Sequence, residues 1–173
     1  VSERPQTTRR AVRGVATDTK AGWQLVLTDL PGVQRPRDAL TERMQRRVER
    51  EIADSDAVLF VVNAEQGVGP GDRFISKALL NVNVSTPVVC AVNKIDRLNN
   101  AETAAVLAAT AELEGVDEIF PVSARKGSGL ESLAARLAEL VPEGPFLYAP
   151  EQRSDLPSEV QLAELIREQV LRR

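Results

Sequence analysis

The sequence predicts an α/β domain built on a mostly parallel sheet. Two short apolar runs, residues 57–62 and 87–92, are rich in β-branched side chains and are bounded by turn-forming residues. Such runs are typical of strands buried inside a parallel sheet. From residue 57 onward, expected strands alternate with expected helices. This alternation indicates a layered α/β fold, in which ligands bind at the carboxyl ends of the strands.

The remaining elements follow in order along the chain. Residues 11–16 and 23–28 are expected strands, and the polar, glycine-containing connection between them favours a hairpin. The spacing of Ser128 and Glu131 predicts a capping box at the start of a helix. Four helices and one further short strand are expected from periodicity and turn signals: helices at 39–53, 71–80, 101–113 and 130–141, and a strand at 119–122.

Composition and charge exclude several classes of function. The 173 residues carry a formal charge of −3, so charge alone does not hold the chain on nucleic acid. The chain has no histidine, which excludes histidine general bases, histidine-containing catalytic dyads and histidine-ligated zinc. Cys90 is the single cysteine and forms no intrachain disulfide, which suits a reducing compartment. The longest apolar run, 57–62, is far shorter than the roughly 20 residues that cross a bilayer.

The most informative motif follows the second apolar run. Asn93-Lys94-Ile95-Asp96 stands in the loop after an expected parallel strand, where an α/β sheet contacts its ligand. The Asp96 carboxylate can accept both the ring N–H and the exocyclic amine of guanine, whereas adenine offers neither donor there. Asn93 would brace the loop, and the stem of Lys94 would lie across the purine ring. The alternative is an ordinary turn in which Asp96 or Asn99 caps the next helix.

Two further motifs also stand after expected strands. Asp29 could hold Mg²⁺ through water, and Gly32, three residues later, could turn its backbone N–H toward a terminal phosphate. Ser123 and Ala124 follow the last expected strand, and backbone N–H groups of that loop could meet a guanine carbonyl. Each motif alone is also compatible with a plain turn. Their order, each at a strand end, favours a guanine-nucleotide site.

The order Asp-x-x-Gly, Asn-Lys-x-Asp, Ser-Ala resembles the P-loop GTPases of the translation-factor class. The likeness narrows to the Era family through three stretches: 5–9 (PQTTR), 29–32 (DLPG) and 166–168 (IRE). It covers nearly the whole chain. The resemblance implies a three-layer α/β/α P-loop GTPase fold with a mostly parallel sheet.

The resemblance also implies a role for individual residues. Thr8 would coordinate Mg²⁺ and sense the terminal phosphate in the first switch, and no catalytic side chain is assigned. Val33 stands where Ras-like enzymes carry a water-orienting glutamine, so hydrolysis would rely on Mg²⁺ and backbone donors and would be slow without a partner. The implied site residues form a magnesium and switch group and a base-reading group: Thr8, Asp29 and Gly32 in the first, and Asn93, Lys94, Asp96, Ser123 and Ala124 in the second.

The role of the arginines in the expected helix at 39–53 has two interpretations. They could contact partners, but a solvated charged face is the favoured interpretation for Arg43, Arg46, Arg47 and Arg50.

The sequence lacks the motif of a phosphate-binding loop. A phosphate-binding loop needs Gly-x-x-x-x-Gly-Lys followed by Ser or Thr, and no lysine of this chain is preceded by glycine. The resemblance implies a chain truncated at both ends, with residues 1–141 as an Era-type GTPase domain that lacks its first strand and phosphate loop, and residues 158–173 as the first helix of a KH-like RNA-binding domain. The Pro-rich composition of residues 142–157 predicts a linker between them.

The absent first strand has a physical consequence. In the family it lies between the strands expected here at 23–28 and 57–62, so two apolar edges would remain unpaired. We expect this stretch alone to be poorly soluble and to bind GTP negligibly.

The resemblance implies a switch GTPase that uses GTP, GDP and Mg²⁺. Its partners would be the small ribosomal subunit and 16S rRNA, bound through the missing KH domain, and no DNA partner is expected. It would be cytoplasmic, with peripheral association at the inner membrane left open. Two alternatives also stay open: a tRNA-modification or double-GTPase relative, and a non-catalytic scaffold that has lost the phosphate loop. Retention of Thr8, Asp29 and Asp96 argues against the scaffold.

Overall fold

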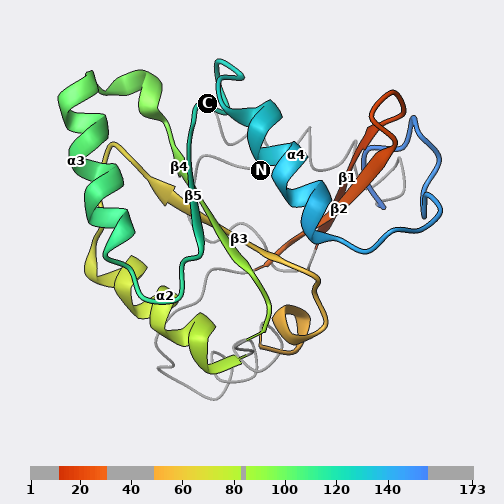
Figure 1. Cartoon of the computed structure of the whole chain (residues 1–173), viewed down its shortest axis with the longest axis horizontal. Helices are drawn as coiled ribbons and strands as arrows, with labels where there is room; N and C mark the ends of the chain where they lie inside the picture. The colour runs from red at the N-terminus through yellow and green to blue at the C-terminus, as the bar shows by residue number, and fades with distance from the viewer. Residues whose placement is uncertain (1–11, 31–48, 83–84, 156–173) are drawn as a thin grey trace, which may run out of the picture. The chain divides into compact units, whose positions relative to one another are not determined.

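The computed structural model describes residues 12–30, 49–82 and 85–155 (Figure 1). The expected helix at 158–173 and most of the helix at 39–53 lie outside these residues, although residues 49–53 are helical. The chain divides into two compact units, made of Val1–Gly32 with Gly144–Arg173, and of Val33–Glu143. Among the described residues, the first unit has a two-stranded sheet and the second a three-stranded sheet.

The first unit contains the predicted hairpin. β1 (Val12–Asp18) pairs antiparallel with β2 (Trp23–Asp29). The Asp18 carboxylate accepts hydrogen bonds from the backbone N–H groups of Lys20 and Ala21, both at 2.9 Å. An aspartate that bonds the backbone two and three residues ahead stabilises a tight turn. The polar connection therefore closes the hairpin as the sequence predicts.

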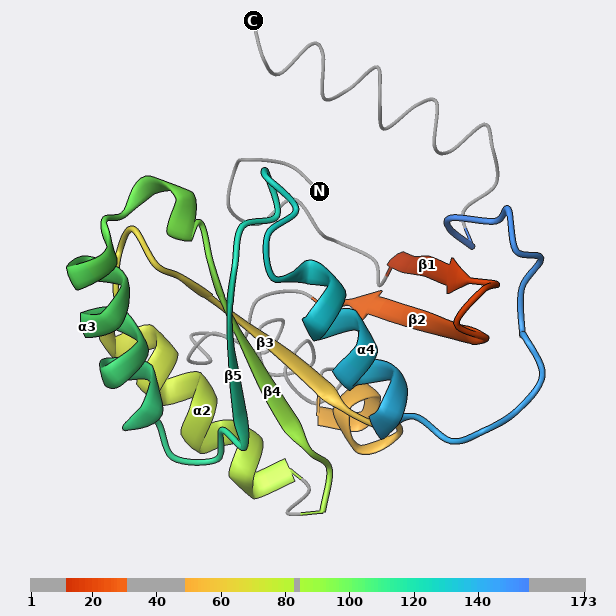
Figure 2. The same ribbon diagram turned by 45° about the horizontal axis from the view of Figure 1, so that its top comes forward.

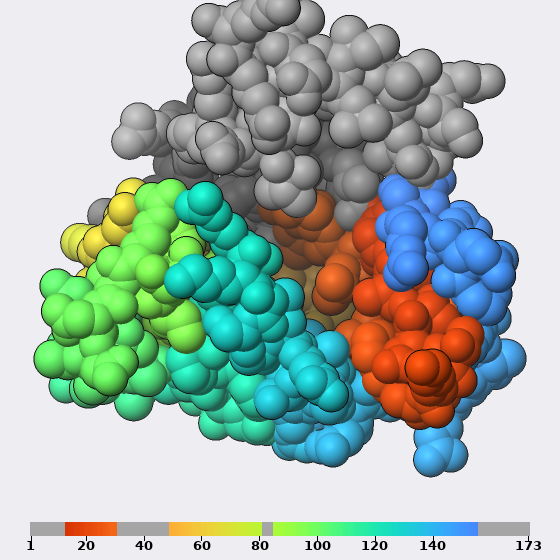
Figure 3. Space-filling model, turned by 90° about the horizontal axis from the view of Figure 1, so that it is seen from above, coloured from red at the N-terminus to blue at the C-terminus, as the bar shows by residue number. Residues whose placement is uncertain are grey.

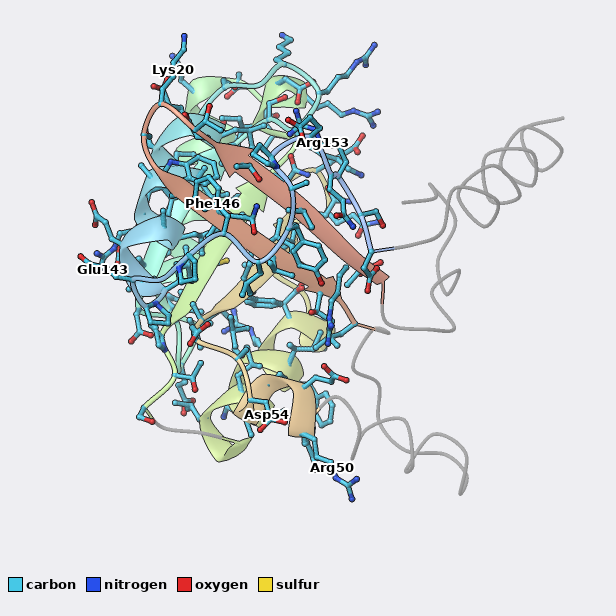
Figure 4. The ribbon with its side chains drawn as sticks, turned by 90° about the vertical axis from the view of Figure 1, so that its right-hand side faces the viewer. Lys20, Arg50, Asp54, Glu143, Phe146 and Arg153 are labelled. Carbon is cyan, nitrogen blue, oxygen red and sulfur yellow. The ribbon has the colours of Figure 1, made fainter. Side chains whose placement is uncertain are left out.

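A segment near the end of the described chain lies along this hairpin. The Gln24 side chain holds its backbone, because Oε1 accepts the N–H groups of Leu147 and Tyr148 at 2.9 Å. Gln24 Nε2 also donates to the Tyr148 carbonyl at 3.0 Å. Further along, the Val15 N–H donates to the Arg153 carbonyl at 2.9 Å. Part of the stretch expected to be a linker is thus bonded to β1 and β2, and Figure 4 shows it running past the hairpin.

The second unit is a parallel sheet between two layers of helices. Three strands lie in the order β3–β4–β5 and both neighbouring pairs are parallel: β3 (Val58–Asn63), β4 (Val88–Asn93) and β5 (Glu118–Val122). Figures 1 and 2 show two helices on one face, α2 (Pro70–Val82) and α3 (Asn100–Ala111), and α4 (Leu130–Leu140) on the other. This arrangement confirms the predicted three-layer α/β fold, and each bound of these helices and strands lies within two residues of its expected position.

The core is centred on β4, which has a strand on each side. Its residues Val89, Cys90 and Val92 have no exposed surface. Within the described residues, β3 pairs only with β4 and carries Val61, which is 53% exposed. In the same part of the chain, β2 pairs only with β1 and carries Leu27, which is 43% exposed. The two strands expected to have open apolar edges therefore lie at the edges of separate sheets.

The starts of α3 and α4 are built differently. The Asn99 side chain accepts the Glu102 N–H at 2.9 Å, and the Glu102 carboxylate accepts the Asn99 N–H at 2.8 Å, which is a capping box. The capping box predicted from Ser128 and Glu131 is wrong. Helix α4 instead begins after Gly129, which has a left-handed φ of 74° and makes no side-chain cap.

Candidate functional site

Two loops that follow neighbouring parallel strands meet at the carboxyl edge of the three-stranded sheet. The loop after β4 contains Asn93, Lys94 and Asp96, and the loop after β5 contains Ser123 and Ala124. Figure 3 shows the segments that follow β4 and β5, coloured green and blue-green, side by side at the surface. The structure therefore brings the whole predicted base-reading group together.

Lys94 turns the chain sharply as it leaves β4. Its φ is 72°, and among the described residues it is the one non-glycine residue with a positive φ. An L-residue in this conformation costs about 1–2 kcal/mol, and such strain concentrates at functional sites. The turn leads directly into a short 3-10 helix, η1 (Ile95–Arg97), which carries Asp96. The sequence offered no sign of this strain, since lysine is not typical of left-handed turns.

Asn93 joins the two loops through one oxygen atom. Its Oδ1 accepts the N–H of Lys94 at 2.7 Å and the N–H of Ala124 at 3.0 Å. The Ala124 N–H is one of the loop's backbone groups that could meet a guanine carbonyl, and in this structure it donates to Asn93. A guanine carbonyl at this place would share that donor with Asn93. The side chain of Asn93 therefore fixes the spacing between the loops.

Asp96 is held by a serine from the neighbouring loop. Ser123 has no exposed surface, and its Oγ donates to Asp96 Oδ1 at 2.6 Å. The same Oγ accepts the Lys126 N–H at 3.1 Å, so the hydroxyl is oriented from both sides. The hydrogen bond from Ser123 lowers the pKa of Asp96, and the positive charges of Lys126 and Arg125 lower it further. Asp96 is therefore an ionised, fixed hydrogen-bond acceptor at neutral pH.

This geometry suits one class of ligand edge. A carboxylate fixed through one oxygen still has lone pairs that accept hydrogen bonds from a ligand. Guanine presents two neighbouring N–H donors on its Watson–Crick edge, whereas adenine presents a ring acceptor at the corresponding place. A carboxylate oxygen facing a ring acceptor would form no hydrogen bond with the base, and the base would also keep water from it. The Asp96 loop can therefore select guanine against adenine.

The magnesium and switch group is placed only in part. Thr8 and Gly32 lie outside the described residues, while Asp29 ends β2 in the first unit with an exposed side chain. Carboxylate oxygens are ligands that Mg²⁺ prefers, so Asp29 fits a magnesium ligand. In the described ranges, no group of three His, Cys, Asp or Glu side chains could hold a metal ion, and no helix there is long and apolar enough to cross a membrane.

Two further charged residues border the loop after β4 and were not singled out in the sequence. Arg97 Nη1 lies 2.9 Å from Glu65 Oε1 and 2.8 Å from Glu65 Oε2. The two residues are 32 positions apart and leave no local pattern, so only the register of β3 on β4 could have indicated the pair. Of the four arginines expected on the charged helix, Arg50 is exposed and the other three lie outside the described residues.

The parallel sheet, the Asn-Lys-x-Asp loop and its contact with the Ser-Ala loop define a GTP-binding domain. Residues 40–143 match the family described as the Elongation factor Tu GTP binding domain. GTPase Era of Lactobacillus helveticus is 38% identical over 171 residues, which cover 99% of this chain and 55% of that protein. GTPase Era of Mycobacterium sp. (strain KMS) is 40% identical and covers 98% of this chain, with 56% of its own length matched.

Solved structures agree with these relatives. The crystal structure of Era in complex with MgGDPNP and nucleotides 1506-1542 of 16S ribosomal RNA aligns with a TM-score of 0.81 at 30% identity, covering 97% of this chain and 56% of that chain. A variant of Aquifex aeolicus Era bound to GDP and AlF4⁻ aligns with a TM-score of 0.80 and the same coverage. The chain belongs to the Era family of these GTP-binding proteins. It spans about half the length of the relatives it matches.

Proposed function

We propose that this chain supplies the base-reading part of an Era-type GTPase, which hydrolyses GTP with Mg²⁺ and acts in assembly of the small ribosomal subunit in the cytoplasm. The observation that carries the proposal is the Asp96 carboxylate, held at 2.6 Å by the buried Ser123 hydroxyl at the carboxyl edge of the sheet. The family match and the nucleotide-bound relatives support the same chemistry.

Six of the eight predicted site residues have a stated role in this proposal. Asp96 would accept the two guanine donors, Asn93 would keep the two loops together, and the stem of Lys94 would lie against the purine ring. Ser123 would hold Asp96 in place. Asp29 and Thr8 would hold Mg²⁺, which when bound neutralises charge on the phosphates. These 173 residues hold no histidine that could act as a general base, so this part of the protein would contribute mainly positioning and electrostatics.

The RNA partner is proposed on different grounds. A structure of Era with a segment of 16S ribosomal RNA aligns over 97% of this chain. The chain itself carries a net charge of −3, so we assign RNA contact mainly to a KH-like domain that would begin at residues 158–173, beyond a GTPase domain at 1–141 and a linker at 142–157. Salt-dependent binding of a 16S rRNA fragment to the full-length protein would test this part. We expect a variant of the full-length protein that ends at residue 157 to lose this binding.

The base-reading role is tested by Asp96→Asn in the protein expressed from the complete coding sequence. Asparagine places an N–H donor against a guanine donor, so GDP affinity should fall by about 100-fold or more. Xanthosine diphosphate should gain affinity, because xanthine carries a carbonyl where guanine carries its amine. Isothermal titration calorimetry with both nucleotides measures the two changes.

A matched control uses the same substitution elsewhere on the sheet. Asp117 accepts the Val88 N–H at 2.7 Å at the start of β4, away from the loops that hold the candidate site. Asp117→Asn should leave the preference for GDP over xanthosine diphosphate unchanged. An unchanged preference in the Asp96 variant would refute the base-reading role.

A further inference from the structure

An ion pair ties the base-reading loop to the far side of β4 from Ser123. Arg97 belongs to η1 and directly follows Asp96, and its Nη1 contacts both carboxylate oxygens of Glu65, at 2.9 and 2.8 Å. The Glu65 and Arg97 side chains are 43% and 49% exposed. Glu65 lies just after β3, so the pair links the turn after one strand to the helix after its neighbour.

Glu65 sits in a turn that is itself well fixed. Asn63 Oδ1 accepts the Glu65 N–H at 3.2 Å, and the Asn63 carbonyl accepts the Gly67 N–H at 3.1 Å. Next to Glu65, the Ala64 N–H donates to the Asn93 carbonyl at 2.9 Å, which joins this turn to the end of β4. An ion pair whose partner is already fixed loses less side-chain entropy when it forms. The turn after β3 is therefore a firm anchor for Arg97.

The base-reading loop is consequently held from two sides. On the β5 side, Ser123 bonds Asp96 and Ala124 bonds Asn93. On the β3 side, Glu65 bonds Arg97. The helix η1 between these contacts has only three residues and closes through two short-range backbone bonds, Arg97 N–H to Lys94 and Leu98 N–H to Ile95, both at 3.1 Å. Such a short element gains its orientation from side-chain contacts at its borders.

We propose that Arg97 and Glu65 are positioning residues for guanine recognition: their ion pair sets the orientation of η1 and thereby the reach of the Asp96 carboxylate to the exocyclic amine of guanine. This inference rests on the proposed function. The ion pair acts by fixing the position of η1 and not by changing the pKa of Asp96. That pKa is lowered first by the hydrogen bond from Ser123 and then by the positive charges of Lys126 and Arg125. Arg97 points to Glu65 instead.

A nucleotide that lacks the exocyclic amine separates this role from a merely structural one. Inosine diphosphate keeps the ring N–H of guanine but has no amine, so it reports on only one of the two contacts to Asp96. If η1 tilts, GDP loses more affinity than inosine diphosphate does. A general loss of stability would weaken both nucleotides equally and leave their ratio unchanged.

The experiment uses the protein expressed from the complete coding sequence, with Arg97→Gln, Glu65→Gln and the double variant. We expect GDP to dissociate about threefold faster from each single variant, a modest effect because both side chains are half exposed. The double variant should show no further increase, and the affinity ratio of GDP to inosine diphosphate should fall by a similar factor. The exchange Glu65→Arg with Arg97→Glu should restore at least part of the ratio, since it rebuilds the pair.

Lys77 and Glu114 provide a matched control pair. They lie 3.1 Å apart, are exposed, and join α2 to the turn after α3 rather than to the base-reading loop. Lys77→Gln should leave the ratio unchanged. The inference is overturned if the Arg97 and Glu65 variants keep the wild-type ratio, or if Lys77→Gln lowers it equally. Failure of the wild-type protein to prefer GDP over adenosine diphosphate would instead overturn the proposed function, and this inference with it.

Discussion

Gly129 offers the sharpest test of how the site is assembled. It precedes α4 with a φ of 74°, and a Cβ at this position would lie 2.4 Å from the Pro121 carbonyl oxygen and 3.2 Å from Val122 Cγ1. The nearer atom belongs to the backbone of β5, so a side-chain rotation cannot relieve the contact. Substitution by alanine must therefore shift either the start of α4 or the end of β5, which leads directly into Ser123.

The expected loss of stability in the Gly129→Ala variant has two parts. The left-handed conformation costs an alanine about 1–2 kcal/mol, and forcing a methyl group into a closely packed contact adds about 1–3 kcal/mol. Gly129→Ala should thus lower the free energy of unfolding by about 2–5 kcal/mol. Gly127 is a matched control in the same loop, because its φ is 77° but a Cβ at that position would have no atom within 4 Å. Gly127→Ala should cost only the conformational part, about 1–2 kcal/mol.

Urea unfolding of the full-length protein, followed by circular dichroism, measures both variants. The midpoint should shift while the dependence on urea stays the same, which marks a change in stability rather than in the unfolded state. The reasoning fails if the two variants differ by less than about 0.5 kcal/mol, because the close approach of Gly129 to Pro121 would then cost nothing. Gly129→Ala should also weaken GDP binding more than Gly127→Ala, since only the former displaces the strand that carries Ser123.

Two further predictions concern contacts away from the site. Gln24→Ala removes the side chain that bonds Leu147 and Tyr148, so hydrogen exchange at these two amides should accelerate by about tenfold or more, as measured by mass spectrometry; unchanged exchange would show that other contacts hold the segment. Burial raises the pKa of the Cys90 thiol to about 12, with a contribution from the negative charge of Asp72, whereas an unfolded thiol ionises near pH 8.5, a value typical of free cysteine. The contribution of the protonated Cys90 thiol to stability should therefore be fully present below about pH 8.5, and the free energy of unfolding should fall by up to about 1.4 kcal/mol per pH unit between there and pH 12. Cys90→Ala should remove this part of the pH dependence. Equal pH dependence of the free energy of unfolding in both proteins would contradict the prediction.

The strands and helices of the described chain were predictable because their signals are local. The run of residues 87–92 is apolar at every position, and only a strand with neighbours on both sides buries all of them. The start of α4 was not predictable in the same way. Ser128 has the sequence of a cap, but the close approach of Gly129 to Pro121 decides the geometry, and that contact exists only in the folded protein.

In the candidate site, too, the residues of one local motif were predictable, whereas the contacts between distant parts of the chain were not. The Asn-Lys-x-Asp motif indicated Asn93 and Asp96 directly, because both lie in one loop. The bond from Ser123 to Asp96 depends on β5 lying next to β4, which no stretch of sequence states. The pairs Gln24 with Tyr148 and Arg97 with Glu65 are separated by 124 and 32 positions and were missed for the same reason.

Strand register explains why the contacts to the base-reading loop converge. Asn63 on β3 is level with Asn93 on β4, and Asn93 is level with Val122 on β5, so the three strands end in one row. The loops therefore start side by side, and Glu65 and Ser123 reach the loop after β4 from its two sides. A slip of one residue between β3 and β4 would turn every side chain of β3 to the opposite face and carry Glu65 away from Arg97. The register that buries the core of this sheet is thus the same register that positions Asp96.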